Sequence, residues 1–253
     1  MTEQIKVAIT APRGAMDSLI VCEAYKDEGL QVTGCIGTPG RDYIGRDAGL
    51  VCGLGTEIGV PVTDSIEKVI DDCSVVVDYS TPELSMEVLD ACLRHGKALL
   101  CGTTGFTEEQ NAAFESAAGQ IPIMKTANTS YVVTVMKQLL AEAAEKIGSR
   151  CRIEVIEMHH QDKKDAPSGT AIEMGRTMAA AAPDKTYDDI TFHSVRAGNT
   201  PSSHRVIFGC MGEKLEISHD AYDWRCYALG ACDGIKFLAG AAPGRIYTME
   251  DVI

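Results

Sequence analysis

Residues 75–83, Val-Val-Val-Asp-Tyr-Ser-Thr-Pro-Glu, combine a continuous apolar run with the beginning of a helix. An apolar run without polar alternation is typical of a strand that is covered on both faces of a sheet. Thr81 followed by Pro82 predicts a helix start, with the threonine as N-cap and the proline at the first helical position. A buried strand that leads into a helix indicates a βα unit, and such units build parallel sheets.

The same alternation extends in both directions from residue 75. Further strands are predicted at 5–10, 30–36, 99–101 and 121–124, with helices at about 16–27 and from Thr107 onwards. A strand about every 25 residues predicts an α/β fold with a parallel sheet. Ligands of such sheets bind at the carboxyl ends of the strands. Those ends carry residues 11–16, 79–82, 102–105 and 127–130.

The pattern changes near residue 130, where a second domain is predicted. Helices are expected at 132–147 and 168–182, and strands at 152–157, 190–195, 204–208 and 214–219. The last three strands follow one another without helices, which predicts an α+β domain at 130–221 with a mixed sheet open on one side. An open sheet face has to be covered, so we expect oligomerisation there. Residues 222–253, a helix and a short tail, are expected to return to the first domain, 1–129.

Composition limits the class of protein. The 253 residues are 45% hydrophobic and 23% charged, which fits a globular protein with room for two small domains. There is no apolar run of about 18 residues and no signal peptide at the N-terminus, so we expect neither membrane insertion nor export. The net charge of −13, without a basic stripe, argues against nucleic acid as a partner.

Ten cysteines are spread along the chain, and no two of them form a Cys-x-x-Cys pair. Their spacing therefore argues against a zinc ribbon or a thioredoxin motif. Most lie among apolar residues, so we expect buried free thiols. Free thiols in this number predict a cytoplasmic location, where the compartment is reducing.

Residues 157–170, Glu-Met-His-His-Gln-Asp-Lys-Lys-Asp-Ala-Pro-Ser-Gly-Thr, hold the densest cluster of histidines and lysines in the chain. The cluster follows a predicted strand, and its last three residues begin a helix. Free N–H groups at a helix start bind carboxylates or phosphates. A histidine supplies a proton and a lysine a cation, so the segment suits reduction of an unsaturated dicarboxylate. The alternative is a solvated strand end followed by a simple N-cap. Adjacent histidines lack the spacing of a zinc site, so no metal is expected.

This segment resembles the signature of the dihydrodipicolinate reductase family, Glu-x-His-His-x-x-Lys-x-Asp-Ala-Pro-Ser-Gly-Thr, at every fixed position. Further resemblances follow in order along nearly the whole chain, at 101–106, 127–130, 194–198 and 249–252, and at His204 and Phe208. The resemblance implies a Rossmann-type nucleotide domain and a substrate-binding domain that forms a homotetramer. It also implies NADH- or NADPH-dependent reduction of 4-hydroxy-tetrahydrodipicolinate to tetrahydrodipicolinate, with loss of water, in diaminopimelate and lysine biosynthesis.

The resemblance implies roles for individual residues. His159 resembles the general acid, and Lys163 resembles a second proton donor that also holds the substrate. Lys164 has no counterpart and is expected to be solvated. The small dicarboxylate substrate is expected at His160, Lys163, Ser168, Gly169 and Thr170. The coenzyme is expected at Ala11, Pro12, Arg13, Gly14, Ala15, Met16, Gly102, Thr103, Thr104, Ala127, Asn128 and Thr129.

The nucleotide-binding loop departs from the family pattern Gly-x-x-Gly-Arg-Met-Gly. Residues 11–17 are Ala-Pro-Arg-Gly-Ala-Met-Asp, so one glycine and the methionine keep their type. Ala11 is acceptable if its φ angle stays negative. Asp17 suits the helix dipole but would repel a pyrophosphate. Arg13 is a candidate replacement for the arginine that is missing at Ala15.

Two other positions of the nucleotide domain are unusual. No acidic residue stands at Gly37 to hold a ribose 2′-hydroxyl, and Arg41 is a candidate contact for a 2′-phosphate. Thr129 stands where the family has phenylalanine. The substrate half therefore matches the family better than the coenzyme half. Two alternatives stay open: a reductase of another small imine or oxo acid, and a non-catalytic homologue that binds the metabolite but not the coenzyme.

Overall fold

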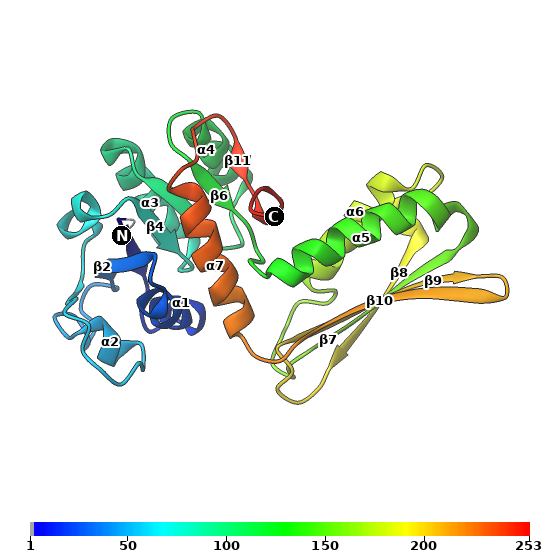
Figure 1. Ribbon diagram of the computed structural model, residues 1–253, viewed down its shortest axis with the longest axis horizontal. Helices are drawn as coiled ribbons and strands as arrows, with labels where there is room; N and C mark the ends of the chain where they lie inside the picture. Colours follow the sequence, from blue (N-terminus) through cyan, green and yellow to red (C-terminus); the bar gives the residue numbers. More distant parts are fainter. Residues whose placement is uncertain (1–2) are drawn as a thin grey trace. The chain divides into compact units, whose positions relative to one another are not determined.

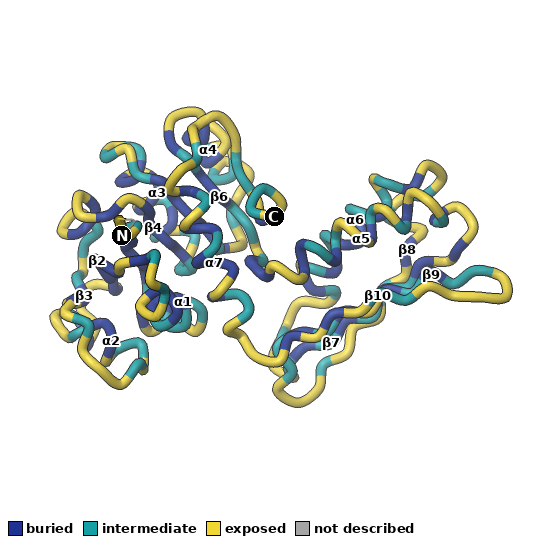
Figure 2. The backbone as a smooth tube through the Cα atoms, viewed as in Figure 1, coloured by how far each residue is buried: buried dark blue, intermediate teal, exposed yellow. Residues whose placement is uncertain are grey.

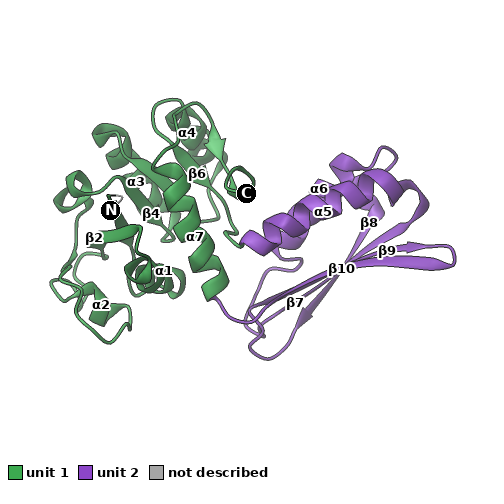
Figure 3. Ribbon diagram, in the orientation of Figure 1, with its two compact units in different colours: residues 1–130, 225–253 green, residues 131–224 purple. Residues whose placement is uncertain are grey.

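The computed structural model describes residues 3–253, which form two compact units (Figure 3). Within the described residues, unit 1 comprises 3–130 and 225–253, and unit 2 comprises Tyr131–Trp224. Among residues 3–253, no helix is long and apolar enough to cross a membrane.

Unit 1 contains the predicted parallel sheet, with seven strands in the order β11-β6-β5-β4-β1-β2-β3 (Figure 1). The strands are β1 (Ile5–Thr10), β2 (Leu30–Ile36), β3 (Val62–Thr63), β4 (Val75–Asp78), β5 (Ala98–Cys101), β6 (Ile123–Lys125) and β11 (Ile246–Tyr247). Every neighbouring pair is parallel. The expected C-terminal tail thus contributes a strand, which the sequence did not reveal because β11 has only two residues.

The helices of unit 1 cover both faces of the sheet, as the apolar run at 75–78 requires. They are α1 (Ala15–Lys26), α2 (Ala48–Val51), α3 (Pro82–His95), α4 (Glu108–Ala118) and α7 (Arg225–Leu238). One buried cluster joins one face to α1 and α7, and another joins the opposite face to α3 and α4. All four residues of β4 are buried, and Figure 2 shows this strand in dark blue. The Thr81 side chain caps α3 and Pro82 stands in its first turn, as predicted.

Unit 2 packs two helices on one face of a four-stranded mixed sheet. Its elements are α5 (Tyr131–Ile147), β7 (Arg152–His159), α6 (Gly169–Ala181), β8 (Ile190–Arg196), β9 (Ser202–Cys210) and β10 (Glu213–Ala221). The strand order is β10-β9-β7-β8, with β7 and β8 parallel and the other pairs antiparallel. Along β7, buried side chains alternate with partly exposed ones, because only one face is covered by helices.

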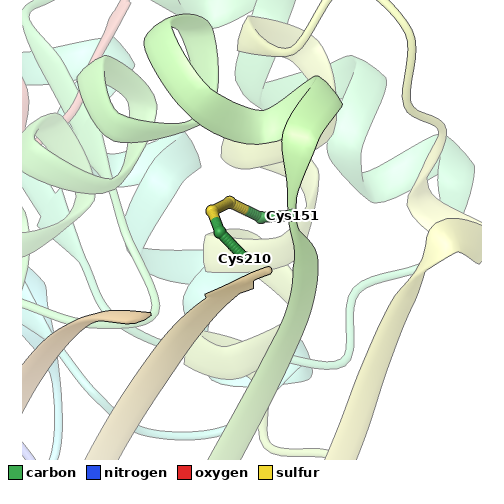
Figure 4. Close-up of a disulfide and its surroundings, with 2 residues drawn as sticks. All are labelled: Cys151 and Cys210. Atoms are coloured by element: carbon green, nitrogen blue, oxygen red, sulfur yellow. A yellow bond between two sulfur atoms is a disulfide. The ribbon is translucent and has the colours of Figure 1, made fainter. Parts of the chain in front are cut away.

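The prediction of ten free thiols is wrong for two cysteines, because Cys151 and Cys210 form a disulfide (Figure 4). The antiparallel register pairs Arg152 of β7 with Gly209 of β9, so the two cysteines lie directly opposite each other at the end of these strands. Their Cα atoms are 4.5 Å apart, within the range that a disulfide can span. The other eight cysteines are free.

The chain leaves β1 through Ala11, whose φ angle is +43°. The expectation of a negative φ angle is therefore not met at this residue. The conformation is held by backbone hydrogen bonds from Ala11 N to the Ile36 carbonyl, at 2.7 Å, and from Gly14 N to the Ala11 carbonyl, at 2.6 Å. A left-handed conformation costs a residue with a Cβ atom roughly 1–2 kcal/mol, and glycine does not bear this cost.

Replacement of Ala11 by glycine should therefore stabilise the protein. The gain in the free energy of unfolding should be up to about 1 kcal/mol, because glycine also increases the entropy of the unfolded chain. Chemical denaturation would measure it. Ala15→Gly is the matched control: Ala15 is exposed at the start of α1, and its replacement should give no gain. A lower stability of Ala11→Gly than of the wild type would show that the positive φ angle of Ala11 does not destabilise the protein.

Candidate active site

The end of β7 carries a buried pair, Glu157 and His159. Glu157 is 0% exposed and His159 is 7% exposed, and both lie on the face of the sheet that the helices cover. His159 Nδ1 lies 2.5 Å from Glu157 Oε2. The carboxylate thus accepts a hydrogen bond from Nδ1–H and leaves Nε2 as the ring nitrogen that can transfer a proton. His159 is therefore a buried, hydrogen-bonded residue and not a solvated strand end.

Arg196, at the end of β8, binds the carboxylate of this pair. Its guanidinium donates to both oxygens of Glu157, from Nη1 at 2.9 Å and from Nη2 at 2.7 Å. It also donates to the backbone carbonyls of Lys163 and Asp165, at 3.2 and 2.6 Å. Arg196 therefore connects the carboxylate to the loop that contains Lys163. No local pattern in the sequence indicates a role for this arginine, although it lies within the segment 194–198 that resembles the family.

The charges at this pair follow from burial and hydrogen bonding. Burial alone would raise the pKa of Glu157, but hydrogen bonds from Arg196, Ser194 and His159 bring it down to about 2. Burial lowers the pKa of His159, and the Glu157 carboxylate opposes this effect. The imidazolium of His159 is thus a stronger acid than that of an ordinary histidine, and the charged Glu157 limits this effect.

Two more buried histidines lie beside His159. The ring centroid of His204 is 5.4 Å from that of His159, and His219 stacks on His204 at 5.9 Å. Burial, and then the neighbouring His159 and His219, lower the pKa of His204 to about 3. Within residues 3–253, neither ring nitrogen of His204 has a hydrogen-bond partner. His204 thus packs against the rings of both His159 and His219.

The cationic loop places its two lysines differently. Lys163 Nζ lies 2.8 Å from Asp165 Oδ1, and the lysine side chain is 22% exposed. An anionic substrate would compete with Asp165 for this ammonium group. Lys164 is exposed, in line with its expected solvation. The backbone N–H of Lys163 donates to the His160 carbonyl at 3.2 Å, which keeps the loop close to the end of β7.

The beginning of α6 lies next to the same carboxylate. Ser168 is 2% exposed, its N–H donates to Glu157 Oε1 at 3.3 Å, and its hydroxyl caps the helix by accepting from Ala171 N at 3.2 Å. Ser168 thus positions the helix. Gly169 is exposed and Thr170 is half-buried, so these two residues of the predicted substrate site lie at the surface of the helix N-terminus.

In unit 1, the predicted coenzyme residues gather at the carboxyl ends of β1, β5 and β6. The strand order reverses between β1 and β4, which is where Rossmann-type sheets bind nucleotides. Gly14 is the N-cap of α1, and no described side chain caps this helix, so its first N–H groups suit a phosphate. A Cβ atom at Gly14 would lie 2.8 Å from Asp17 Oδ2, and one at Gly102 would lie 2.0 Å from the ring of Tyr79. Both glycines are therefore required by close packing.

Asp17 is turned into the protein, away from the position that the sequence suggested. It is 1% exposed, and its Oδ1 accepts hydrogen bonds from Tyr79 N at 3.2 Å and from Thr10 Oγ1 at 3.4 Å. Burial, and then the nearby Asp78, raise the pKa of Asp17 well above its usual value. Asp78 itself accepts hydrogen bonds from the hydroxyls of Thr10, Ser80, Ser85 and Thr103. The raised pKa favours the neutral form of Asp17, and the neutral acid does not repel a pyrophosphate in the way that the sequence predicts.

Arg13 points towards the loop that follows β2. Its Nη1 lies 2.8 Å from Asp42 Oδ1, and its guanidinium lies 5.2 Å from the ring centroid of Tyr43. Tyr43 also accounts for the absence of an acidic residue at position 37. A Cβ atom at Gly37 would lie 2.5 Å from the tyrosine ring. Arg41, in the same loop, is exposed.

The other predicted coenzyme residues divide into supporting and surface positions. Thr129 is 1% exposed, donates to the Tyr227 carbonyl at 2.7 Å and accepts from the Tyr79 hydroxyl at 3.3 Å. Thr129 thus occupies the position of the family phenylalanine, and hydrogen bonds hold it there. Pro12 and Thr103 are also buried, whereas Met16 and Asn128 are half-buried, and Ala15, Thr104 and Ala127 are exposed.

A Rossmann-type unit and a second unit with a buried carboxylate–imidazole pair together define a nucleotide-dependent oxidoreductase. Two sequence-family models match the chain. The model for the N-terminus of dihydrodipicolinate reductase matches residues 5–129, and the model for its C-terminus matches residues 132–253. The chain belongs to the dihydrodipicolinate reductase family. This family uses NADH or NADPH, and the open N-terminus of α1 fits that coenzyme.

Individual relatives agree with this assignment. The chain is 36% identical to the 4-hydroxy-tetrahydrodipicolinate reductases of Geobacter metallireducens and of Syntrophotalea carbinolica, with 98% of each chain covered in both comparisons. A dipicolinate-bound dihydrodipicolinate reductase from Paenisporosarcina sp. TG-14 superposes with a TM-score of 0.80 at 26% identity, covering 99% of this chain and all of the other.

Replacement of Asp17 by asparagine should remove a pH dependence of coenzyme binding. Protonated Asp17 is neutral, so the wild-type affinity for NADH or NADPH should fall as the pH rises through the raised pKa of Asp17. The loss should be roughly tenfold, which corresponds to a repulsion of about 1.4 kcal/mol. Fluorescence titration of the coenzyme across a pH series would measure it.

The Asp17→Asn variant should keep the low-pH affinity throughout the series. Asp64→Asn is the control, because Asp64 is an exposed acid of the same unit that pairs with Lys68. It should leave the wild-type profile unchanged. A wild-type affinity that does not vary with pH would show that Asp17 does not influence the bound coenzyme.

Proposed function

We propose that the protein reduces 4-hydroxy-tetrahydrodipicolinate to tetrahydrodipicolinate with NADH or NADPH, with loss of water, in the biosynthesis of diaminopimelate and lysine. The observation that carries the proposal is the buried Glu157–His159 pair beside the Lys163 loop and the start of α6. The relatives of the same length that bear this activity in their names support it.

Each group of this site has a role in the proposed reaction. The ring of the substrate loses water, and the unsaturated product accepts a hydride and a proton. When bound, the reduced nicotinamide supplies the hydride. His159 donates the proton from Nε2, oriented by Glu157, and Lys163 is a second proton donor that also holds a substrate carboxylate. His160, Gly169 and Thr170 bind the carboxylates, with the N–H groups at the start of α6 as donors.

The activity test follows the absorbance of NADH and NADPH, with substrate made freshly from pyruvate and aspartate semialdehyde by the preceding synthase. Oxidation of either coenzyme by the wild type is expected. His159→Gln should lower kcat by about 10²–10⁴-fold, the usual contribution of a general acid, and leave coenzyme binding unchanged. Lys163→Ala should lower kcat and raise KM, because it removes a charge that faces carboxylates.

Lys164→Ala is the matched control for the lysine variant, because Lys164 is exposed in the same loop, and it should behave as wild type. A defect in Lys164→Ala instead of Lys163→Ala would shift the proposed role by one residue. Oxidation only with another imine or oxo acid would favour the alternative substrate. No oxidation by folded protein with any substrate would favour a non-catalytic metabolite-binding homologue.

We also propose that the open face of the unit 2 sheet joins copies of this chain in a homotetramer. The face carries the apolar side chains of Ile156, Met158, Val195 and Ile207, and charged residues surround them. Val195 is 40% exposed, and the helices cover only the opposite face. Apolar residues grouped on an open sheet are typical of a subunit interface.

The oligomer would be disrupted by a charge at the centre of this face. Ile156→Glu should reduce the molar mass measured by light scattering from four chains to fewer, because the carboxylate would be buried without a partner. Asp184→Lys, in the exposed loop after α6, should leave the mass unchanged. A wild-type mass of one chain would contradict the proposed assembly.

A cytoplasmic location is part of the same proposal. The reaction consumes a reduced nicotinamide coenzyme, and eight cysteines are free thiols. The net charge of −13 disfavours nucleic acid as a partner.

A further inference from the structure

A concavity opens beside the carboxyl end of β7, entirely within unit 2. Its volume is about 560 Å³, a size typical of small-molecule sites. The lining residues are His160, Gln161, Asp162, Gly198, Asn199 and Trp224. His160, which belongs to the proposed substrate site, connects this concavity to the catalytic pair through its neighbour His159.

The walls of the concavity are held together by the backbone. Gln161 N donates to the Gly198 carbonyl at 3.0 Å, and Ala197 N donates to the His159 carbonyl at 3.0 Å. These bonds join the segment after β7 to the segment after β8. Arg196 adds its hydrogen bonds to the carbonyls of the 163–165 loop. The concavity is therefore bounded by segments that are already ordered around the catalytic pair.

Trp224 forms one wall and is the only tryptophan in the sequence. Its side chain is 42% exposed, and its ring centroid lies 5.9 Å from that of His160, with 62° between the ring planes. An indole and an imidazole in this edge-to-face arrangement present flat apolar surface next to polar ring edges. Such a surface suits a small flat ring that carries polar groups.

Charge alone does not explain binding at this wall. The described lining contains the acidic residue Asp162 and no lysine or arginine. A dicarboxylate needs a source of affinity other than ion pairing here, and ring packing supplies one because burial of an aromatic surface is favourable. Asp162 repels anions in general, so an anion that binds here depends on the ring contact for its affinity.

We propose that Trp224 packs against the ring of the bound substrate and, with His160, makes the site select six-membered heterocyclic dicarboxylates over open-chain ones. This inference rests on the proposed function and adds a specificity-determining residue to it. Trp224 lies outside the motif at 157–170 and received no role from the resemblance to the family.

The intrinsic fluorescence of the protein tests this contact directly, because the single tryptophan reports on the concavity. Dipicolinate, a flat ring dicarboxylate, should change the emission of the full-length wild-type protein in a saturable manner. Glutarate, an open-chain dicarboxylate, should change it little at the same concentration. No saturable change with dipicolinate, or an equal response to glutarate, would overturn the proposal.

Variants of Trp224 separate ring packing from a merely structural role. Trp224→Ala should raise KM and the calorimetric dissociation constant of dipicolinate about tenfold, with kcat within about threefold and coenzyme binding unchanged. Trp224→Phe keeps a flat ring and should stay within about threefold of wild type in KM. Tyr222→Ala is the control, because Tyr222 is 96% exposed and does not line the concavity.

Should Trp224→Ala fail to fold, Trp224→Leu retains apolar volume without a flat ring and provides the same comparison with Trp224→Phe. Equal dipicolinate affinity in wild type and in the folded Ala or Leu variant would overturn the proposal. Failure of the proposed function itself is distinguishable, because the wild type would then bind dipicolinate but oxidise neither coenzyme.

Discussion

The buried carboxylate of Glu157 is the interaction on which unit 2 depends. An ionised carboxylate without partners would be very costly at full burial. Arg196 neutralises its charge with two hydrogen bonds, and His159 Nδ1 and Ser168 N complete its shell. These partners come from the end of β8, the end of β7 and the start of α6. One charge therefore positions the proposed general acid and the helix N-terminus that we propose as the site for the substrate carboxylates.

Unit 1 also contains a buried acidic residue, Asp17, but its neighbours differ from those of Glu157. The departures from the family loop are accommodated inside the protein: Asp17 is buried under the loop, and Thr129 replaces an aromatic ring by hydrogen bonds. The N-terminus of α1 stays open, so the feature that binds a pyrophosphate is retained. The altered loop is thus compatible with a working coenzyme site.

The substrate half combines charge and shape. Lys163 and the start of α6 supply positive potential, whereas the wall formed by His160 and Trp224 supplies a flat surface. Because the molecule is strongly acidic overall, local cations have to overcome its general repulsion of anions. The proposed ring packing against Trp224 would reduce the share of affinity that charge must provide.

The sequence by itself determined the features that depend on neighbouring residues. The βα alternation, the α+β segment and the motif at 157–170 could be predicted because strand and helix patterns, caps and short motifs are local. Only the tertiary structure decided which distant residues meet. The Cys151–Cys210 disulfide spans 59 residues and the Glu157–Arg196 pair spans 39, and both depend on strand register. The burial of Asp17 likewise depends on β1 and β4 lying side by side, which no local pattern specifies.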